Sequence, residues 1–339
     1  MTGPPTPVTV PPTPVTGPPT PVTGLRAPVL ICAVALAIVL GLCGCGMNAA
    51  RHGTVQTTAS PVTVLRGGPP AHIAVIVMEN EEYRDIIGSR QTPFINVLAR
   101  RYALARSMYA ITHPSLPNYL AVTGGSTFGI DSDCTDCHVP SSRSLADQLT
   151  AAHLSWKAYM EGLPHACYRG AAAGLYAKKH DPFMYYDRIA RDPAQCAHVV
   201  PLTELAQDER ARTLARFVWI TPNLCHDMHN CPPLLGDAFL ARVVPPLLTA
   251  LGPRGLLILT WDEGDTDDGC CRVAAGGHIA TVFAGGLAAP HAQLTRPVDQ
   301  YSILQAIEDL LRLQRLRGAA CPCTPSLAPL LHGGGGARG

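Results

Sequence analysis

The chain has 339 residues, of which 47% are hydrophobic and 15% are charged. This composition supports a sizeable core and excludes wholesale disorder. The formal net charge is +1, so the chain lacks the field that attracts a long polyanion, and we expect no nucleic-acid partner.

The N-terminal region differs from the rest of the chain, since no Asp or Glu precedes Glu79. Residues 1–24 form a Pro-rich repeat that cannot pack a core, so we expect them to be extended and disordered. In the segment 25–45, residues 27–45 follow Arg26 and carry no charge, and their length lies between a signal-peptide core and a membrane span. The stretch ending at Cys45 resembles a bacterial lipobox. We expect an exported chain, secreted or anchored in the cell-surface membrane, with residues 46–70 as a linker.

Strands and helices alternate through residues 71–315, which we expect to form one folded domain. Continuous apolar runs predict buried strands at 72–78, 255–261 and 279–285, and two further strands are predicted at 154–160 and 215–220. Helical spacing predicts helices at 92–105, 144–153, 236–251 and 300–313, with an interruption near Pro245 and Pro246. The alternation predicts an α/β three-layer sandwich around a mainly parallel sheet. The Pro- and Gly-rich residues 316–339 are expected to be a flexible tail.

The chain has 13 cysteines, and ten of them follow Cys45. An exported protein can oxidise this even number. The CxxC motif Cys134–Cys137 then favours a structural disulfide over a zinc site or a redox motif. The cysteines at 225 and 231 bracket a polar loop that they could staple. The vicinal pair Cys270–Cys271 is expected to bond with other cysteines.

Polar side chains collect at the ends of the predicted strands. Because working groups lie outside the carboxyl ends of strands in open α/β sheets, we expect them to converge at one edge. Carboxylates and imidazoles in this mixture suit a divalent metal ion. Any one of them alone could be a helix cap or a surface charge, and residues 262–268 alone could be a solvated acidic loop or a calcium loop. The side chains are Glu79, Asn80, Asn223, His226, Asp227, His229, Asp262, Glu263 and His278.

The segment ITHPSLPNYLAVTGG, residues 111–125, places Ser115 between two prolines and ahead of an apolar run. Ser115 is either a turn residue or a nucleophile held at the start of a helix. A free serine hydroxyl is a poor nucleophile at neutral pH, so the second interpretation needs a metal or a base beside it.

Seven segments together carry a resemblance to a known family. In chain order they are VIVMENEEYRDIIG, TPFINVLA, THPSLPNYLAVTGGSTFG, YAKKH, PNLCHDMH, LLILTWDEGD and HIATVFAG. The chain resembles the bacterial phosphoesterase family of secreted acid phosphatases and phospholipase-C-type enzymes, within the alkaline phosphatase superfamily. The likeness is strongest to short secreted acid phosphatases that include phosphoinositide phosphatases. It covers about residues 73–285.

The resemblance implies an alkaline-phosphatase-like catalytic domain over residues 71–315. It implies that Ser115 is the nucleophile, with Thr112 as a rival, and that Asn118 donates a hydrogen bond to a phosphoryl oxygen. Three basic residues would neutralise phosphate or protonate the leaving group, or else form a solvated basic loop: Lys178, Lys179 and His180. The implied metal ligands are Glu79, Asn80, Asp227, His229, Asp262, Glu263 and His278.

The implied function is an exported, metal-dependent phosphomonoesterase, an acid phosphatase with a phosphoserine intermediate. Its partners would be phosphate esters, with phosphoinositides and phospholipids as candidates, and a membrane through the N-terminal segment or a lipid. The sequence has Asp262-Glu263 where better-known members of the superfamily have Asp-His, so one or two divalent ions are expected.

Three alternatives stay open: a phospholipase-C-type phosphodiesterase, a sulfatase-like hydrolase, and a non-catalytic surface lipoprotein with a degenerate site. The sulfatase setting Cys/Ser-x-Pro-x-Arg is incomplete here, because Tyr119 stands where the Arg belongs.

Overall fold

The computed structural model describes residues 68–332. The expected Pro-rich repeat, the apolar segment 25–45 and nearly all of the linker 46–70 lie outside the described residues, as do residues 333–339.

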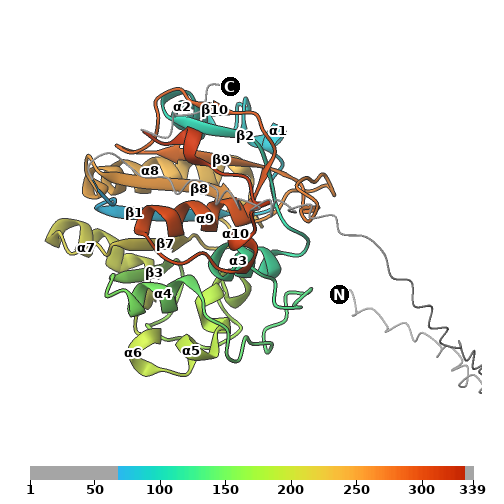
Figure 1. Ribbon diagram of the computed structural model, residues 1–339. Helices are drawn as coiled ribbons and strands as arrows, with labels where there is room; N and C mark the ends of the chain where they lie inside the picture. The colour runs from blue at the N-terminus through green and yellow to red at the C-terminus, as the bar shows by residue number, and fades with distance from the viewer. Residues whose placement is uncertain (1–67, 333–339) are drawn as a thin grey trace, which may run out of the picture. The chain divides into compact units, whose positions relative to one another are not determined.

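A nine-stranded sheet forms the middle of the domain (Figure 1), in the order β10-β2-β9-β8-β1-β7-β3-β6, with β11 also paired to β2. Only β9 runs antiparallel to its neighbours, so the predicted mainly parallel sheet is confirmed. The strands are β1 (His72–Met78), β2 (Ala103–Tyr109), β3 (Trp156–Met160), β6 (Val199–Pro201), β7 (Phe217–Thr221), β8 (Gly255–Trp261), β9 (His278–Ala284), β10 (Gln293–Leu294) and β11 (Val298–Asp299). A separate hairpin joins β4 (Ala172–Ala173) to β5 (Tyr176–Ala177).

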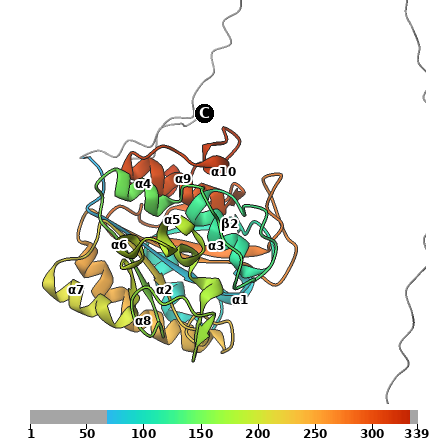
Figure 2. The same ribbon diagram turned by 90° about the horizontal axis from the view of Figure 1, so that it is seen from below.

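Helices cover both faces of the sheet, as Figure 2 shows from below, and the predicted three-layer α/β fold is confirmed. One layer holds α2 (Pro93–Arg101), α7 (Leu205–Ala211) and α8 (Pro233–Leu251). The other holds α3 (Ser115–Gly124), α4 (Leu145–Ala151), α9 (Gln300–Leu311) and α10 (Arg317–Ala320). Short elements lie in the connections: α1 (Tyr83–Ile86), α5 (Asp187–Ala190), α6 (Pro193–Cys196), η1 (Lys178–His180), η2 (Pro182–Tyr185), η3 (Leu202–Glu204) and η4 (Ala328–Leu330).

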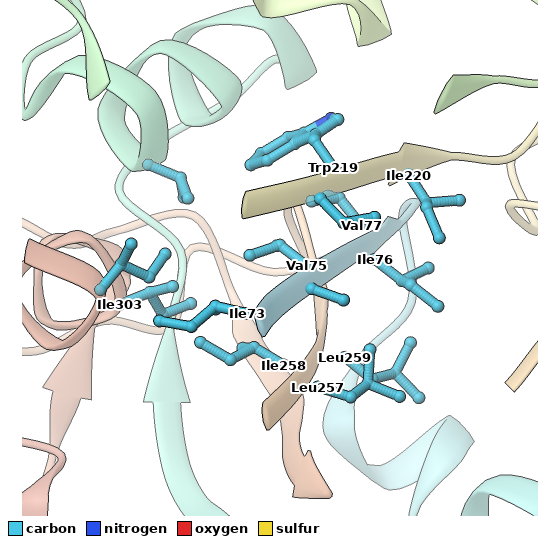
Figure 3. Close-up of a cluster of buried hydrophobic side chains, with 14 of the residues drawn as sticks. Ile73, Val75, Ile76, Val77, Trp219, Ile220, Leu257, Ile258, Leu259 and Ile303 are labelled. Atoms are coloured by element: carbon cyan, nitrogen blue, oxygen red, sulfur yellow. The ribbon is translucent and has the colours of Figure 1, made fainter. Parts of the chain in front are cut away.

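The core lies on both sides of the central strands (Figure 3). Ile73 of β1 faces Ile303 of α9, while Leu257 and Leu259 of β8 point to the opposite layer. Side chains alternate across a strand, so a strand with helices on both faces must be apolar throughout. Each such side chain contributes about 1.5–3 kcal/mol when it is fully buried. This burial holds the strand ends, and the residues that follow them, in fixed places.

Two predicted helices differ from the structure. The helix expected over 92–105 ends at Arg101, and residues 103–109 form β2 because they pair with β9. The helix expected to break near Pro245 and Pro246 is continuous from Pro233 to Leu251. Both prolines are exposed, so water can reach the carbonyl groups that lose their hydrogen-bond donors. Within residues 68–332, α8 is the one helix long and apolar enough to cross a membrane, and it packs on β1 and β8 as a core helix.

The expected flexible tail is wrong for residues 316–332. The amide of Leu316 donates to Glu308 Oε1 at 3.0 Å, and the Gln305 side chain donates to the carbonyl oxygen of Ala319 at 3.1 Å. Leu327 and Leu330 are buried. These apolar side chains give the segment a place against the domain, which its Pro- and Gly-rich composition did not indicate.

Ten cysteines of the described part form five disulfides: Cys134–Cys137, Cys167–Cys196, Cys225–Cys231, Cys270–Cys271 and Cys321–Cys323. The predicted bonds at 134–137 and 225–231 are confirmed. The expectation for Cys270 and Cys271 is wrong, because they bond to each other. Paired backbone hydrogen bonds between Cys270 and Ala274 close a tight local turn there. The other eight described cysteines pair among themselves.

Candidate functional site

The carboxyl ends of β1, β7 and β8 meet at one edge of the sheet. The amide of Glu79 donates to the carbonyl oxygen of Asp227 at 2.8 Å, and the amide of Asn80 donates to Asp262 Oδ1 at 3.1 Å. Three predicted clusters, each following a different strand, therefore lie side by side. Parallel strands make this arrangement, because their carboxyl ends share an edge.

Four residues form an oxygen-rich group at this edge. Glu79, Asp262 and Glu263 are all buried. The Asn80 side-chain amide lies 3.2 Å from Glu79 Oε2 and 3.3 Å from Glu263 Oε1. Burial, followed by the charges of Glu79 and Glu263, raises the pKa of Asp262 well above its usual value. Burial also raises the pKa of Glu263 to about 7. The group brings three buried carboxyl groups close together, and such a concentration of acidic groups is the usual environment of a bound cation.

Ser115 is the first residue of α3, and its side chain lies against this group. Its Oγ donates toward Glu79 Oε2 at 3.1 Å and toward Glu263 Oε1 at 3.3 Å. The following helix is buried along its whole length and packs on α9. The apolar run after Ser115 thus fixes the hydroxyl relative to the two carboxylates.

Asn118 and Thr112 have different surroundings from those expected. The buried Asn118 amide donates to the carbonyl oxygens of Thr112 and Pro114 and accepts from the Thr112 amide at 3.0 Å. It is therefore occupied in holding the turn before Ser115, and the role of phosphoryl donor expected for it is not supported. The Thr112 hydroxyl donates to the carbonyl oxygen of His113 at 3.2 Å. A Cβ at Gly276 would meet the backbone of Thr112, so a glycine is needed for this approach.

His180 lies between two acids. Its Nε2 is 3.1 Å from Glu79 Oε2, and its Nδ1 is 3.2 Å from Asp227 Oδ2. Burial would lower the pKa of His180, but Glu79 and Asp227 outweigh burial and raise it to about 9. Burial raises the pKa of Asp227. The alternative of a solvated basic loop is wrong for His180, which is buried.

The two lysines before His180 separate in space. Lys179 Nζ lies 3.1 Å from His229 Nε2 and donates to Asp133 Oδ2 at 2.8 Å. Lys178 Nζ donates to the carbonyl oxygen of Thr135 at 2.8 Å and lies over the Tyr185 ring. The structure brings Lys179 and His229 to the site and directs Lys178 into the neighbouring loop.

His278 follows a different course from the other expected ligands. Its Nε2 lies 2.8 Å from the carbonyl oxygen of Arg106, and its ring stacks on Tyr83 and Tyr109. His278 lies at the same edge of the sheet as the other predicted ligands, but its side chain contacts Arg106 and Tyr109 of β2. Its expected role as a metal ligand is not supported.

Three site residues were missed from the sequence. Tyr119 donates from its hydroxyl to Glu79 Oε1. His113 Nδ1 lies 2.7 Å from Glu263 Oε2. Asp133 accepts from the amide of Leu116 at 3.0 Å as well as from Lys179. Tyr119 stands four positions after Ser115 on one helix face, which is a signal that could have been used. Asp133 follows no strand, so no pattern indicated it.

The residues present fit a divalent metal ion. Ligand atoms of Glu79, His180 and His229 all lie within 4.8 Å of one another. One buried carboxylate oxygen at this edge, Asp262 Oδ2, has no hydrogen-bond partner, and the ion-paired His180 Nε2 and Asp227 Oδ2 form no hydrogen bond of good geometry. Buried polar atoms are nearly always paired, and carboxylate oxygens with imidazole nitrogens are ligands of divalent cations. The expectation of a metal site is supported, without the identity or number of ions.

Comparison with solved structures shows the fold. A protein of the alkaline phosphatase superfamily from Vibrio parahaemolyticus matches with a TM-score of 0.54 at 12% identity, covering 80% of this chain and 73% of that one. A Bacteroides thetaiotaomicron protein, described with glycosaminoglycan metabolism and as a 6S-sulfatase, matches with a TM-score of 0.52 at 14% identity, over 78% and 82% of the two chains. The domain has the α/β fold of the alkaline phosphatase superfamily.

Comparison with sequences shows the family. Residues 87–314 match the model of the Phosphoesterase family, and the chain belongs to that family. It is 31% identical over 246 residues to phosphatidylinositol-3-phosphatase of Mycobacterium tuberculosis, covering 72% of this chain and 78% of that one. It is 31% identical over 215 residues to the phosphate-repressible acid phosphatase of Penicillium chrysogenum, covering 61% of this chain and 51% of that one, about half its length. The predicted enzyme class, a hydrolase of phosphate esters, is confirmed at the level of the family.

Proposed function

We propose that the chain is a metal-dependent phosphomonoesterase with Ser115 as its nucleophile. The observation that carries the proposal is the position of the Ser115 hydroxyl, which lies 3.1 Å from Glu79 and 3.3 Å from Glu263 at the start of a buried helix. A serine needs such an acceptor to become nucleophilic. Thr112 lacks one, because its hydroxyl donates to the carbonyl oxygen of His113.

In the first half-reaction Ser115 Oγ forms a bond to phosphorus and its proton passes to Glu263. Burial raises the pKa of Glu263 to about 7, so a large fraction can accept a proton near neutral pH. The bond from phosphorus to the leaving oxygen breaks while His180 gives that oxygen a proton. The pKa of His180, raised to about 9 by Glu79 and Asp227 against the effect of burial, keeps the ring protonated.

In the second half-reaction water attacks the phosphoserine. The water proton returns to His180, phosphate leaves, and Ser115 recovers its proton from Glu263. Lys179, held by Asp133 at 2.8 Å, would neutralise the non-bridging oxygens throughout. A divalent ion would be held by Glu79, Asn80 and Asp262, and when bound it would supply polarisation of the phosphate and a lower pKa for the Ser115 hydroxyl.

The test is substitution of the two rival hydroxyls. Ser115→Ala should reduce release of p-nitrophenol from p-nitrophenyl phosphate by on the order of a thousandfold or more. Within residues 68–332 the Ser115 hydroxyl is the one that bonds both Glu79 and Glu263, whereas the Tyr119 hydroxyl bonds Glu79 alone. Thr112→Ala should retain most of the activity. An active Ser115→Ala enzyme together with an inactive Thr112→Ala enzyme would assign the nucleophile to Thr112.

The natural substrate and location form part of the same proposal. The name of the Mycobacterium tuberculosis relative supports a phosphoinositide as substrate. A phospholipase-C-type phosphodiesterase is the second candidate, and release of a phosphorylated headgroup from phosphatidylcholine would identify it. The five disulfides support export. Export through residues 25–45, with Cys45 as a lipid attachment site, completes the proposal.

A further inference from the structure

Exposed apolar side chains occur on two of the segments that contribute residues to the site. In the part of the chain that the structure describes, five large hydrophobic side chains are exposed, and Leu175, Leu234 and Leu235 are three of them, at 46%, 52% and 45%. Single exposed leucines are ordinary on a protein surface. These three instead occur on the two segments that carry Lys179 and His229, the hairpin β4–β5 and the chain around the start of α8.

The two segments contact each other. The amide of Leu224 donates to the carbonyl oxygen of Leu175 at 3.0 Å, and Lys179 Nζ lies 3.1 Å from His229 Nε2. The hairpin tip reads Ala-Ala-Ala-Gly-Leu over residues 171–175, and four of its five residues are exposed while Ala173 is partly exposed. We call residues 171–175 together with Leu234 and Leu235 the apolar rim.

Charge around the apolar rim favours one kind of partner. Residues 162–179 contain no Asp or Glu but include His165, Arg169 and two lysines. Residues 222–236 contain one acid, Asp227, which is buried. Other loops at the same edge of the sheet carry the exposed acids: Asp131, Asp136, Asp265, Asp267 and Asp268. An apolar tip with basic flanks and no exposed carboxylate of its own complements a lipid layer with anionic headgroups.

We infer that the apolar rim docks the domain on an anionic lipid surface and presents the site to phosphate esters held in that surface. Leu175 enters the acyl boundary while Arg169 contacts lipid phosphates. Since Lys179 follows Leu175 by four residues, a headgroup at the surface lies within reach of the site. The substrate class rests on the proposed function, whereas the docking itself can be measured without any turnover.

The experiment places a fluorescent reporter in the apolar rim of the full chain. Leu175→Trp is compared with Val97→Trp, a matched control on α2, where Val97 is 50% exposed. The three native tryptophans, at 156, 219 and 261, are buried and give a constant background. Both variants carry the same N-terminal segment, so attachment through that segment affects them equally. Vesicles of phosphatidylcholine with phosphatidylserine, brominated in the acyl chains, then report contact with the bilayer interior.

We expect the new tryptophan of Leu175→Trp to lose emission to the brominated lipid and shift to shorter wavelength, and that of Val97→Trp to do neither. Leu235→Trp provides a second position if Leu175→Trp does not fold. Equal quenching at the hairpin and at Val97, or none at either rim position, overturns the inference. Hydrolysis of p-nitrophenyl phosphate distinguishes failure of the docking from failure of the proposed function. If the rim variants are active but are not quenched, the docking is refuted and the phosphatase activity stands. If Leu175→Trp is quenched but the wild-type protein hydrolyses no p-nitrophenyl phosphate, the phosphatase activity is refuted and the docking stands.

Discussion

Glu308 of α9 is a buried acid whose replacement by a residue that cannot ionise should stabilise the protein. It is fully buried, and burial raises its pKa to about 9 from 4.5. One oxygen accepts from the Leu316 amide at 3.0 Å, while Glu308 Oε2 and the neighbouring Gln148 Oε1 have no hydrogen-bond partner. The folded state therefore keeps a proton that the unfolded chain releases above pH 4.5, so this group lowers stability as pH rises from 4.5 to 9.

The substitution Glu308→Gln removes this proton from the folding equilibrium. At pH 7, which is 2.5 pH units above the unfolded-state pKa of 4.5, the free energy of unfolding of the variant should exceed that of the wild type by about 3 kcal/mol. At pH 4 both proteins carry a neutral group, so their stabilities should be nearly equal. Urea unfolding at the two pH values measures the difference, with the slope of the transition checked for constancy.

Asp309→Asn is the matched control on the same helix. The Asp309 carboxylate accepts two hydrogen bonds from Arg315, both at 2.7 Å, so its neutralisation should destabilise the protein at pH 7. A gain for Glu308→Gln that is the same at pH 4 and pH 7, or a loss at pH 7, would refute the assignment of a neutral, buried Glu308.

Two further outcomes concern the site. Asp133→Asn should raise KM for p-nitrophenyl phosphate about tenfold with a smaller change in kcat, since it weakens a charge-assisted hydrogen bond to Lys179; Asp136→Asn, an exposed acid of the same loop, should leave KM unchanged. Dialysis against a chelator should abolish the activity, and addition of a divalent cation should restore it and raise Tm. If the added cation also restores the activity of Glu79→Gln to the wild-type level, Glu79 is not a ligand.

The sequence was most informative where burial alone decides the structure. Strands 72–78 and 255–261 were predicted with the observed bounds, because a strand covered on both faces admits only apolar residues. The polar residues after these strands were predicted to meet, since the shared edge of a parallel sheet follows from its topology. Residues 103–105 were misassigned because Ala-Leu-Ala suits a helix equally well, and only pairing with β9, far away in sequence, makes it a strand.

The sequence could not predict which partner each side chain of the site contacts. Asn118 has the chemistry of a phosphoryl donor, but its target is the preceding turn. Adjacent Lys178 and Lys179 looked equivalent, yet one bonds the carbonyl oxygen of Thr135 and the other reaches Asp133 and His229. Asp133 directly precedes the loop closed by Cys134–Cys137, and no periodic pattern connects it to the nucleophile. Such choices depend on distances of a few tenths of an ångström.

The direction of β1 also separates the N-terminal entry of the described domain from its site. The described chain enters at the amino end of β1, whereas the site and the apolar rim lie beyond its carboxyl end, across a strand of seven residues, or about 23 Å. The polarity of this one buried strand therefore keeps the N-terminal entry of the described domain and its site on opposite edges of the sheet.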